Sequence, residues 1–72
     1  MAELLLVDTE TDAERARLTL DGDEVRYSGE DADLARDILR DRARARDVTE
    51  AEAFRQYRRW GWANGPLALR TP

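Results

Sequence analysis

The spacing of apolar residues changes at Ser28-Gly29, and this change constrains the fold more than any other feature of the chain. Residues 3–8 form a short apolar run of strand length, and residues 15–20 alternate between apolar and polar side chains. Gly22 lies in an acidic turn, after which Val25 and Tyr27 continue the alternation. The first part of the chain therefore predicts three strands, the last two of them joined as a hairpin.

After Ser28-Gly29 the apolar residues follow helical spacing, which predicts a helix from residue 32 or 33 to residue 46. At 100° per residue one side of this helix carries Leu34, Ala35, Ile38, Leu39 and Ala45. The other side carries three acid–arginine pairs spaced i,i+3, namely Asp33 with Arg36, Asp37 with Arg40 and Asp41 with Arg44. This pairing gives the column of arginines on the helix a structural explanation.

A second helix is predicted to begin at Thr49, which with Glu52 forms a capping box. We expect this helix to reach residue 59 or 60 and to end at Gly61. Its predicted buried face carries Ala53, Phe54, Tyr57 and Trp60. Residues 61–66 are expected to be irregular, and residues 67–70 to form a short final strand.

The expected element order is β-β-β-α-α-β, in one domain that spans residues 1–72. The apolar sides of the strands and helices must cover one another, so we predict an α+β fold with two layers. In this fold a small antiparallel sheet is covered on one face by two helices. A chain of 72 residues buries only a thin core, and contacts with a partner or with itself often compensate for this.

The composition argues against catalysis and against a metal or cofactor site. The chain has no cysteine and no histidine, and Ser28 is its only serine. Asp8, Glu10 and Asp12 have the spacing that opens a calcium loop, but the sixth and twelfth positions of that loop are Ala13 and Thr19 instead of Gly and Glu. We therefore expect a protein that is not an enzyme, with no cofactor and no metal.

The net charge of −4 is divided unevenly along the chain. Residues 1–33 carry eleven acidic and three basic side chains, and residues 34–72 carry five acidic and nine basic ones, so the two parts have charges of −8 and +4. Attraction between the two parts within one fold explains this division, and a basic face for an acidic partner is the alternative. No targeting or membrane segment is recognisable, so a cytoplasmic protein, or one built into a particle assembled there, is expected.

Arginines lie among aromatic residues in the second part of the chain, and five residues there are candidates for binding a partner. They are Trp62, Arg58, Arg59, Arg42 and Arg55. Tryptophan and arginine are the usual residues of interface hot spots. Trp62 follows the predicted helix end, where it is either a lid on the core or an anchor for a partner. The position of Arg42 within the apolar stripe predicts either a side chain that reaches out to water or one that faces a partner.

The segment Trp60-Gly61-Trp62-Ala63-Asn64-Gly65 resembles the Gly-Trp-Ser-Asn-Gly endings of small proteins from actinobacteria and their phages, with Ala63 in place of the serine. This resemblance implies a phage- or prophage-encoded accessory protein, of the virion or its assembly. We therefore expect a non-catalytic interaction or structural module that binds a protein or itself, and no membrane. The alternatives are a nucleic-acid-binding module that uses the arginines, and a small antitoxin or inhibitor.

Overall fold

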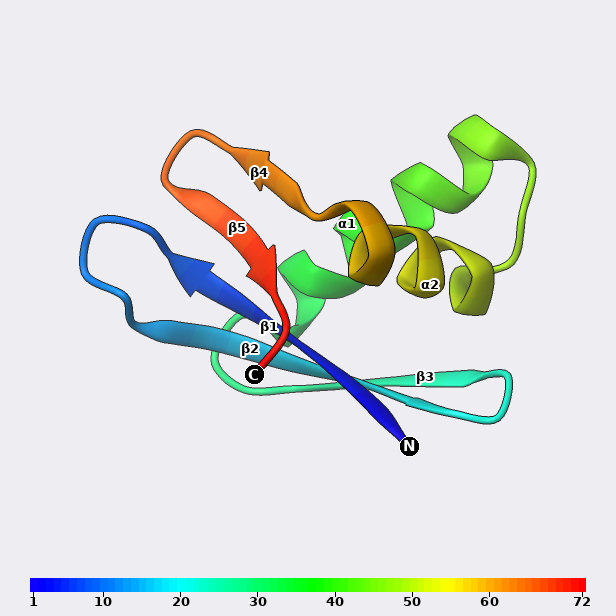
Figure 1. The fold of residues 1–72 in the computed structure, drawn as a ribbon, viewed down its shortest axis with the longest axis horizontal. Helices are drawn as coiled ribbons and strands as arrows, with labels where there is room; N and C mark the ends of the chain where they lie inside the picture. Colours follow the sequence, from blue (N-terminus) through cyan, green and yellow to red (C-terminus); the bar gives the residue numbers. More distant parts are fainter.

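Alternating apolar residues build a five-stranded antiparallel sheet in the computed structural model, which describes all 72 residues (Figure 1). The strands are β1 (Ala2–Asp8), β2 (Glu14–Asp21), β3 (Glu24–Ser28), β4 (Trp62–Asn64) and β5 (Leu67–Arg70). The helices, α1 (Ala32–Arg46) and α2 (Glu50–Trp60), connect β3 to β4. The predicted α+β fold is confirmed, and the chain has one strand more than the sequence indicated.

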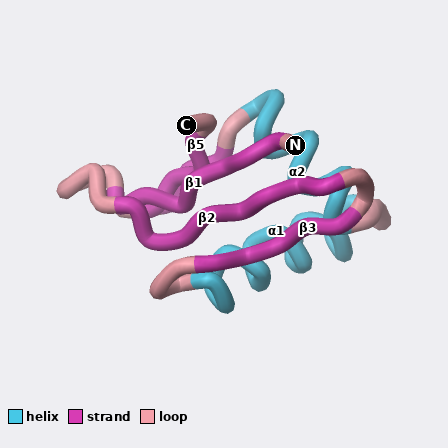
Figure 2. Tube along the Cα trace, turned by 90° about the horizontal axis from the view of Figure 1, so that it is seen from below, coloured by secondary structure: helices cyan, strands magenta, loops and turns pink.

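The strand order in the sheet is β3-β2-β1-β5-β4, so the last hairpin of the chain pairs with its first strand. Leu6 lies at the centre of this arrangement, opposite Ala16 on β2 and Leu69 on β5. Both helices pack on the same face of the sheet (Figure 2). The predicted two-layer architecture is therefore present, with β3 and β4 as the two edge strands.

The core lies between the sheet and the helices. Twelve buried residues form one cluster, and its fully buried large side chains are Phe54, Leu4, Leu6, Leu18 and Leu39. Phe54 comes from α2 and Leu39 from α1, while the other three come from β1 and β2. No polar or charged residue is buried, so burial of apolar surface is the main force that holds the two layers together.

Helix α1 has the predicted bounds, but two residues assigned to its apolar side are exposed. Leu34 is 39% exposed and Ala45 is also on the surface. The buried stripe is centred on Ala35 and Leu39, and Leu34 lies about 140° from Leu39 around the helix. Ala43, which lies on the other side of Leu39, packs against the core instead. The prediction for Leu34 and Ala45 was wrong because the stripe is narrower and rotated.

Two of the three predicted ion pairs along α1 are formed. Arg36 is 2.9 Å from Asp33, and Arg44 is 2.6 Å from Asp41. The side chain of Arg40 does not bind Asp37, because its Nε donates a 2.8 Å hydrogen bond to Glu50 at the start of α2. Neither helix is of the length and apolar character that crossing a bilayer requires.

The capping box at the start of α2 is confirmed on its threonine side. The hydroxyl oxygen of Thr49 accepts a 3.1 Å hydrogen bond from the backbone N–H of Glu52. The helix ends at Gly61, whose φ of 77° is easy only for glycine. The prediction that Trp60 belongs to the buried face was wrong: its side chain is 66% exposed, because it lies in the last turn of the helix, beyond the core.

Residues 61–66 contain strand β4, so the prediction of an irregular segment was also wrong. Trp62 pairs with Leu69 and Asn64 with Leu67, leaving Gly65 and Pro66 as a two-residue connection. Gly65 has a φ of 60°, the positive value that such hairpin turns need at their first central residue. The hairpin adds an edge to the sheet and returns the chain to β1.

Candidate functional site

Arginines without an acidic partner distinguish one region of the surface from the rest. Eight of the twelve arginines lie within 4.0 Å of a carboxylate: Arg15, Arg17, Arg26, Arg36, Arg40, Arg44, Arg55 and Arg70. The four that do not are Arg42 and Arg46 on α1, and Arg58 and Arg59 on α2. These four guanidinium groups are free to bind an anionic group from outside the molecule.

Trp60 links the two helices' unpaired arginines. It lines a hollow of about 460 Å³ together with Arg42, Arg46 and Gln56. It also lines a second hollow of about 250 Å³, whose other residues are Glu52, Arg55, Gln56 and Arg59. We call Arg42, Arg46, Gln56, Arg59 and Trp60 the basic surface. An exposed aromatic ring with cationic groups on either side is suited to an anionic partner that also offers apolar contact.

The guanidinium group of Arg59 lies over the ring of Trp60. The guanidinium carbon of Arg59 lies 5.6 Å from the centre of the ring, within the range of a cation–π contact. This contact restrains the long side chain of Arg59, which has no carboxylate within 4.0 Å. Trp60 and Arg59 therefore form a pre-arranged pair, which lowers the entropy that binding a partner would cost.

Arg42 connects α1 to α2. Its Nε donates a 2.9 Å hydrogen bond to the side-chain oxygen of Gln56, and its guanidinium carbon lies 5.4 Å from the centre of the Tyr57 ring. Stacking on an aromatic ring explains why an arginine is tolerated within the apolar stripe of α1. Arg42 is therefore partly structural, while Arg46 one turn later has no partner within the chain.

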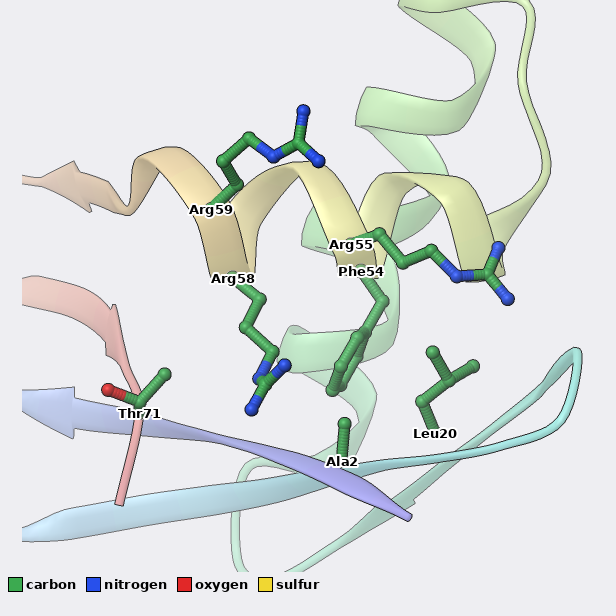
Figure 3. A pocket seen from close by; sticks show the side chains of 7 residues that line it. All are labelled: Ala2, Leu20, Phe54, Arg55, Arg58, Arg59 and Thr71. Carbon is green, nitrogen blue, oxygen red and sulfur yellow. The ribbon is translucent and has the colours of Figure 1, made fainter.

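Arg55 and Arg58 border a third hollow, of about 670 Å³, between α2 and the sheet (Figure 3). Arg55 is held at the turn between β2 and β3, 3.2 Å from Asp23 and 3.3 Å from the carbonyl oxygen of Gly22. Figure 3 shows Phe54 pointing toward the sheet between these two arginines, and Arg59 pointing away from it. Phe54 is fully buried, so its own ring adds almost no accessible surface to this hollow.

Trp62 lies apart from the arginines, on β4. Its ring meets that of Tyr57 edge-on, with the ring centres 6.3 Å apart and the planes at 60°. Trp62 is partly buried and packs against the core, which favours the lid over the anchor. Of the other candidate residues, Arg42 and Arg59 lie in the basic surface, Arg55 is bonded to Asp23, and Arg58 lies at the hollow between α2 and the sheet.

Sequence reasoning missed Trp60, Arg46 and Gln56. Trp60 was assigned to the core because it lies only about 20° from the buried Ala53 on the helical wheel. The wheel shows direction around a helix but not whether other elements reach that far along it. The position of Gly61 next to Trp60 was the one available signal, since it ends the helix there.

The open face of the sheet, by contrast, has paired charges. Arg17 lies 2.9 Å from Glu3 and 3.1 Å from Glu14, and Arg70 lies 2.7 Å from Asp12. Pairing within the molecule leaves this face with little tendency to attract a charged partner. At the adjoining loop, Asp8 accepts hydrogen bonds from the backbone of Glu10 and Thr11, a local turn in place of the calcium loop.

Glu50 joins β3, α1 and α2 in a hydrogen-bonded group. It accepts a 2.7 Å bond from the hydroxyl of Tyr27 and the 2.8 Å bond from Arg40. Burial alone raises the pKa of Glu50, but the two hydrogen bonds and the charge of Arg40 outweigh it, so the pKa lies below its ordinary value. Burial and the hydrogen bond to Glu50 both raise the pKa of Tyr27. Each of Tyr27, Arg40 and Glu50 has a hydrogen-bond partner within the group, so these side chains stabilise the packing of β3 against the helices.

Comparisons with known proteins add no family to this geometry. No protein-family model matches the chain, and no curated protein or solved structure is similar enough to count as a match.

Proposed function

We propose that the protein is a small non-catalytic interaction module whose basic surface binds an acidic protein. The observation that carries this proposal is that three of the four arginines without a carboxylate partner, Arg42, Arg46 and Arg59, line hollows that the exposed Trp60 also lines. The other eight arginines each have a carboxylate within 4.0 Å. An acidic partner would replace the missing carboxylates, and its apolar groups would cover Trp60.

A protein partner fits this surface better than a nucleic acid does. A nucleic acid carries a phosphate at every nucleotide, so the net charge of −4 opposes it along its whole length, whereas a folded protein can present a single acidic patch with apolar groups beside it. Glu52, which has no arginine partner, lies in one of the two hollows at Trp60 and opposes a phosphate there. Nucleic acid remains the second candidate because an exposed tryptophan beside arginines can stack on a base.

Two anionic probes separate these candidates. The tryptophan fluorescence of the protein would be titrated with poly-L-glutamate and with single-stranded DNA at low salt. We expect poly-L-glutamate to bind and to be released as salt rises, because exposed charges are screened beyond about 10 Å at 0.1 M salt. Tight DNA binding with a steep salt dependence would favour the nucleic-acid module instead.

The matched control compares two double variants that remove the same charge. Arg46→Ala/Arg59→Ala removes two unpaired arginines of the basic surface, and Arg26→Ala/Arg44→Ala removes two exposed arginines that have carboxylate partners. We expect at least a tenfold loss of poly-L-glutamate binding in the first variant and little change in the second. Equal losses in both variants would mean that total charge alone, and not the basic surface, attracts the probe.

The setting of such a module is a further part of the proposal. The resemblance of residues 60–65 to endings of actinobacterial and phage proteins supports an accessory component of a phage particle. An antitoxin or inhibitor uses the same kind of surface against a different partner. Packaging or capsid genes next to the gene support the first setting, and a neighbouring toxin gene supports the second.

A further inference from the structure

The acidic residues also divide into paired and unpaired groups. The five carboxylates with no arginine within 4.0 Å are those of Glu10, Glu30, Asp37, Asp47 and Glu52. Two of them, Glu30 and Asp37, lie on either side of Leu34 in the sequence, four residues before it and three after it. Asp37 is its i,i+3 neighbour on the surface of α1.

Leu34 is itself unusual. Only three large apolar side chains are exposed in the molecule: Met1, Leu34 and Trp60. Glu30, Asp33 and Asp37 are close neighbours of Leu34 in the sequence at the start of α1, and we call these four residues the acidic patch. Trp60 is surrounded by unpaired arginines. The acidic patch and the basic surface are therefore complementary: each contains one exposed apolar side chain, and the neighbouring charges are negative in the first and positive in the second.

We propose that the basic surface of one molecule binds the acidic patch of a second copy of the same chain. This inference rests on the proposed function and names its partner. In the complex Leu34 of one copy contacts Trp60 of the other, and Glu30 and Asp37 meet the arginines. The apolar contact removes water from around the charges, which strengthens their attraction.

The acidic patch is held away from the arginines of the basic surface within one molecule. Leu34 lies in the first turn of α1, and Arg42 and Arg46 lie in its last two turns. At 1.5 Å per residue, eight residues of helix hold Leu34 and Arg42 about 12 Å apart. Because the rigid α1 helix fixes this separation, Leu34 and its neighbouring acids do not reach Arg42 and Arg46 of the same molecule, and a second molecule can supply the missing partners.

A contact between two different regions of the same chain is head-to-tail. Each bound pair leaves one basic surface and one acidic patch free, so the contact repeats into rings or filaments instead of stopping at a dimer. The charge division along the sequence, −8 in residues 1–33 and +4 in residues 34–72, suits such an arrangement. Association is therefore expected to increase with protein concentration and to weaken with salt.

Sedimentation of the full chain from micromolar to millimolar concentration tests this inference. We expect the average mass to exceed that of a dimer at high concentration and low salt. Raising the salt to about 1 M, where the screening length falls to about 3 Å, should return it to the monomer. A mass that stays at one chain throughout would overturn the inference.

Two variants on exposed positions test which regions meet. Arg46→Ala/Arg59→Ala/Trp60→Ser removes the basic surface, and Glu30→Gln/Leu34→Gln/Asp37→Asn removes the acidic patch. We expect each variant alone to be monomeric, because each retains only one half of the contact. An equal mixture should form a one-to-one complex and nothing larger, since only one pair of intact regions remains.

Other outcomes separate this inference from the proposed function. A monomeric wild type that still binds poly-L-glutamate would overturn self-association and leave the interaction module standing. A monomeric wild type that binds no acidic probe would overturn both. Self-association that survives in either variant would overturn the head-to-tail contact. The same contact would be overturned if the wild type stopped at a dimer and the mixture of variants stayed monomeric. Circular dichroism of both variants confirms that they are folded.

Discussion

Some side-chain interactions in this protein are set by neighbouring residues in the chain, and others are set by the fold. The hydroxyl of Thr49 acts through a bond three residues away in the chain, so its role follows from the sequence alone. Arg40 also has a suitable local partner in Asp37 but binds Glu50, which the fold brings close. The value of an exposed helical ion pair is only about 0.2–0.5 kcal/mol, so a better-placed carboxylate easily displaces it.

Replacing Thr49 tests the local effect. We expect Thr49→Ala to lower the free energy of unfolding by about 0.5–2 kcal/mol, because the N–H of Glu52 loses its capping oxygen. Urea denaturation measures the change, and Thr49→Ser, which keeps the hydroxyl, is the control. An unchanged midpoint for Thr49→Ala would mean that the cap does not stabilise α2.

At the scale of elements, the contacts between helices and sheet decide which residues are buried and which remain exposed. Helix α2 buries one face and ends at Gly61, which leaves Trp60 beyond the core. The next element, β4, turns back and places Trp62 against Tyr57. Two tryptophans only two residues apart therefore have different roles, one exposed among arginines and the other packed on the core.

Substituting the two tryptophans separately tests this division. We expect Trp62→Ala to lower the thermal midpoint markedly, because it removes a large ring that packs on Tyr57 and the core. Trp60→Ala should change the midpoint little and weaken binding of poly-L-glutamate. A stable Trp62→Ala protein with lost binding would restore Trp62 as the anchor for a partner.

The group around Glu50 ties three elements together and predicts a dependence on pH. Its carboxyl has a lowered pKa in the folded protein, so the ionised form is favoured by folding. This contribution to stability is complete above the ordinary glutamate pKa and is lost as pH falls through the lowered pKa.

Urea denaturation across acidic pH measures this contribution. The difference in unfolding free energy between the wild type and Glu50→Gln should shrink as pH falls below the ordinary glutamate pKa. Glu10→Gln is the control, because Glu10 is exposed and has no arginine partner. A difference that stays constant over this range would show that ionisation of Glu50 does not stabilise the fold.

At the scale of the whole molecule, one continuous core joins both layers. Twelve buried residues from strands and helices form a single cluster, so neither layer keeps a core without the other. A small domain of this kind is expected to unfold in one cooperative step. Surface charge adds little to this stability, since exposed ion pairs typically contribute about 0–1 kcal/mol each.

Cooperativity can be checked by following thermal unfolding with two probes. Far-ultraviolet circular dichroism reports on the helices, and fluorescence of the Trp60→Phe variant reports on Trp62 at the end of the core. We expect the two transitions to coincide. Loss of the Trp62 signal at a lower temperature would show that the β4–β5 hairpin detaches before the rest unfolds.

The sequence by itself determined the elements whose formation depends on neighbouring residues. These are the apolar run of β1, the alternating strands β2 and β3, the bounds of α1, the Thr49 cap and the end of α2 at Gly61. Periodicity and capping act over a few residues, and for this reason they can be recognised in the chain alone. The two-layer α+β arrangement followed from the apolar faces of these elements.

Only the tertiary structure decided which side chains remained unpaired. The pairing of β5 with β1, the exposure of Trp60 and Leu34, and the contact of Arg40 with Glu50 depend on residues far apart in the chain. Whether an arginine is free depends on every carboxylate that folding brings near it. The basic surface can therefore be recognised only in the folded protein, because ion pairing in three dimensions does not follow sequence spacing.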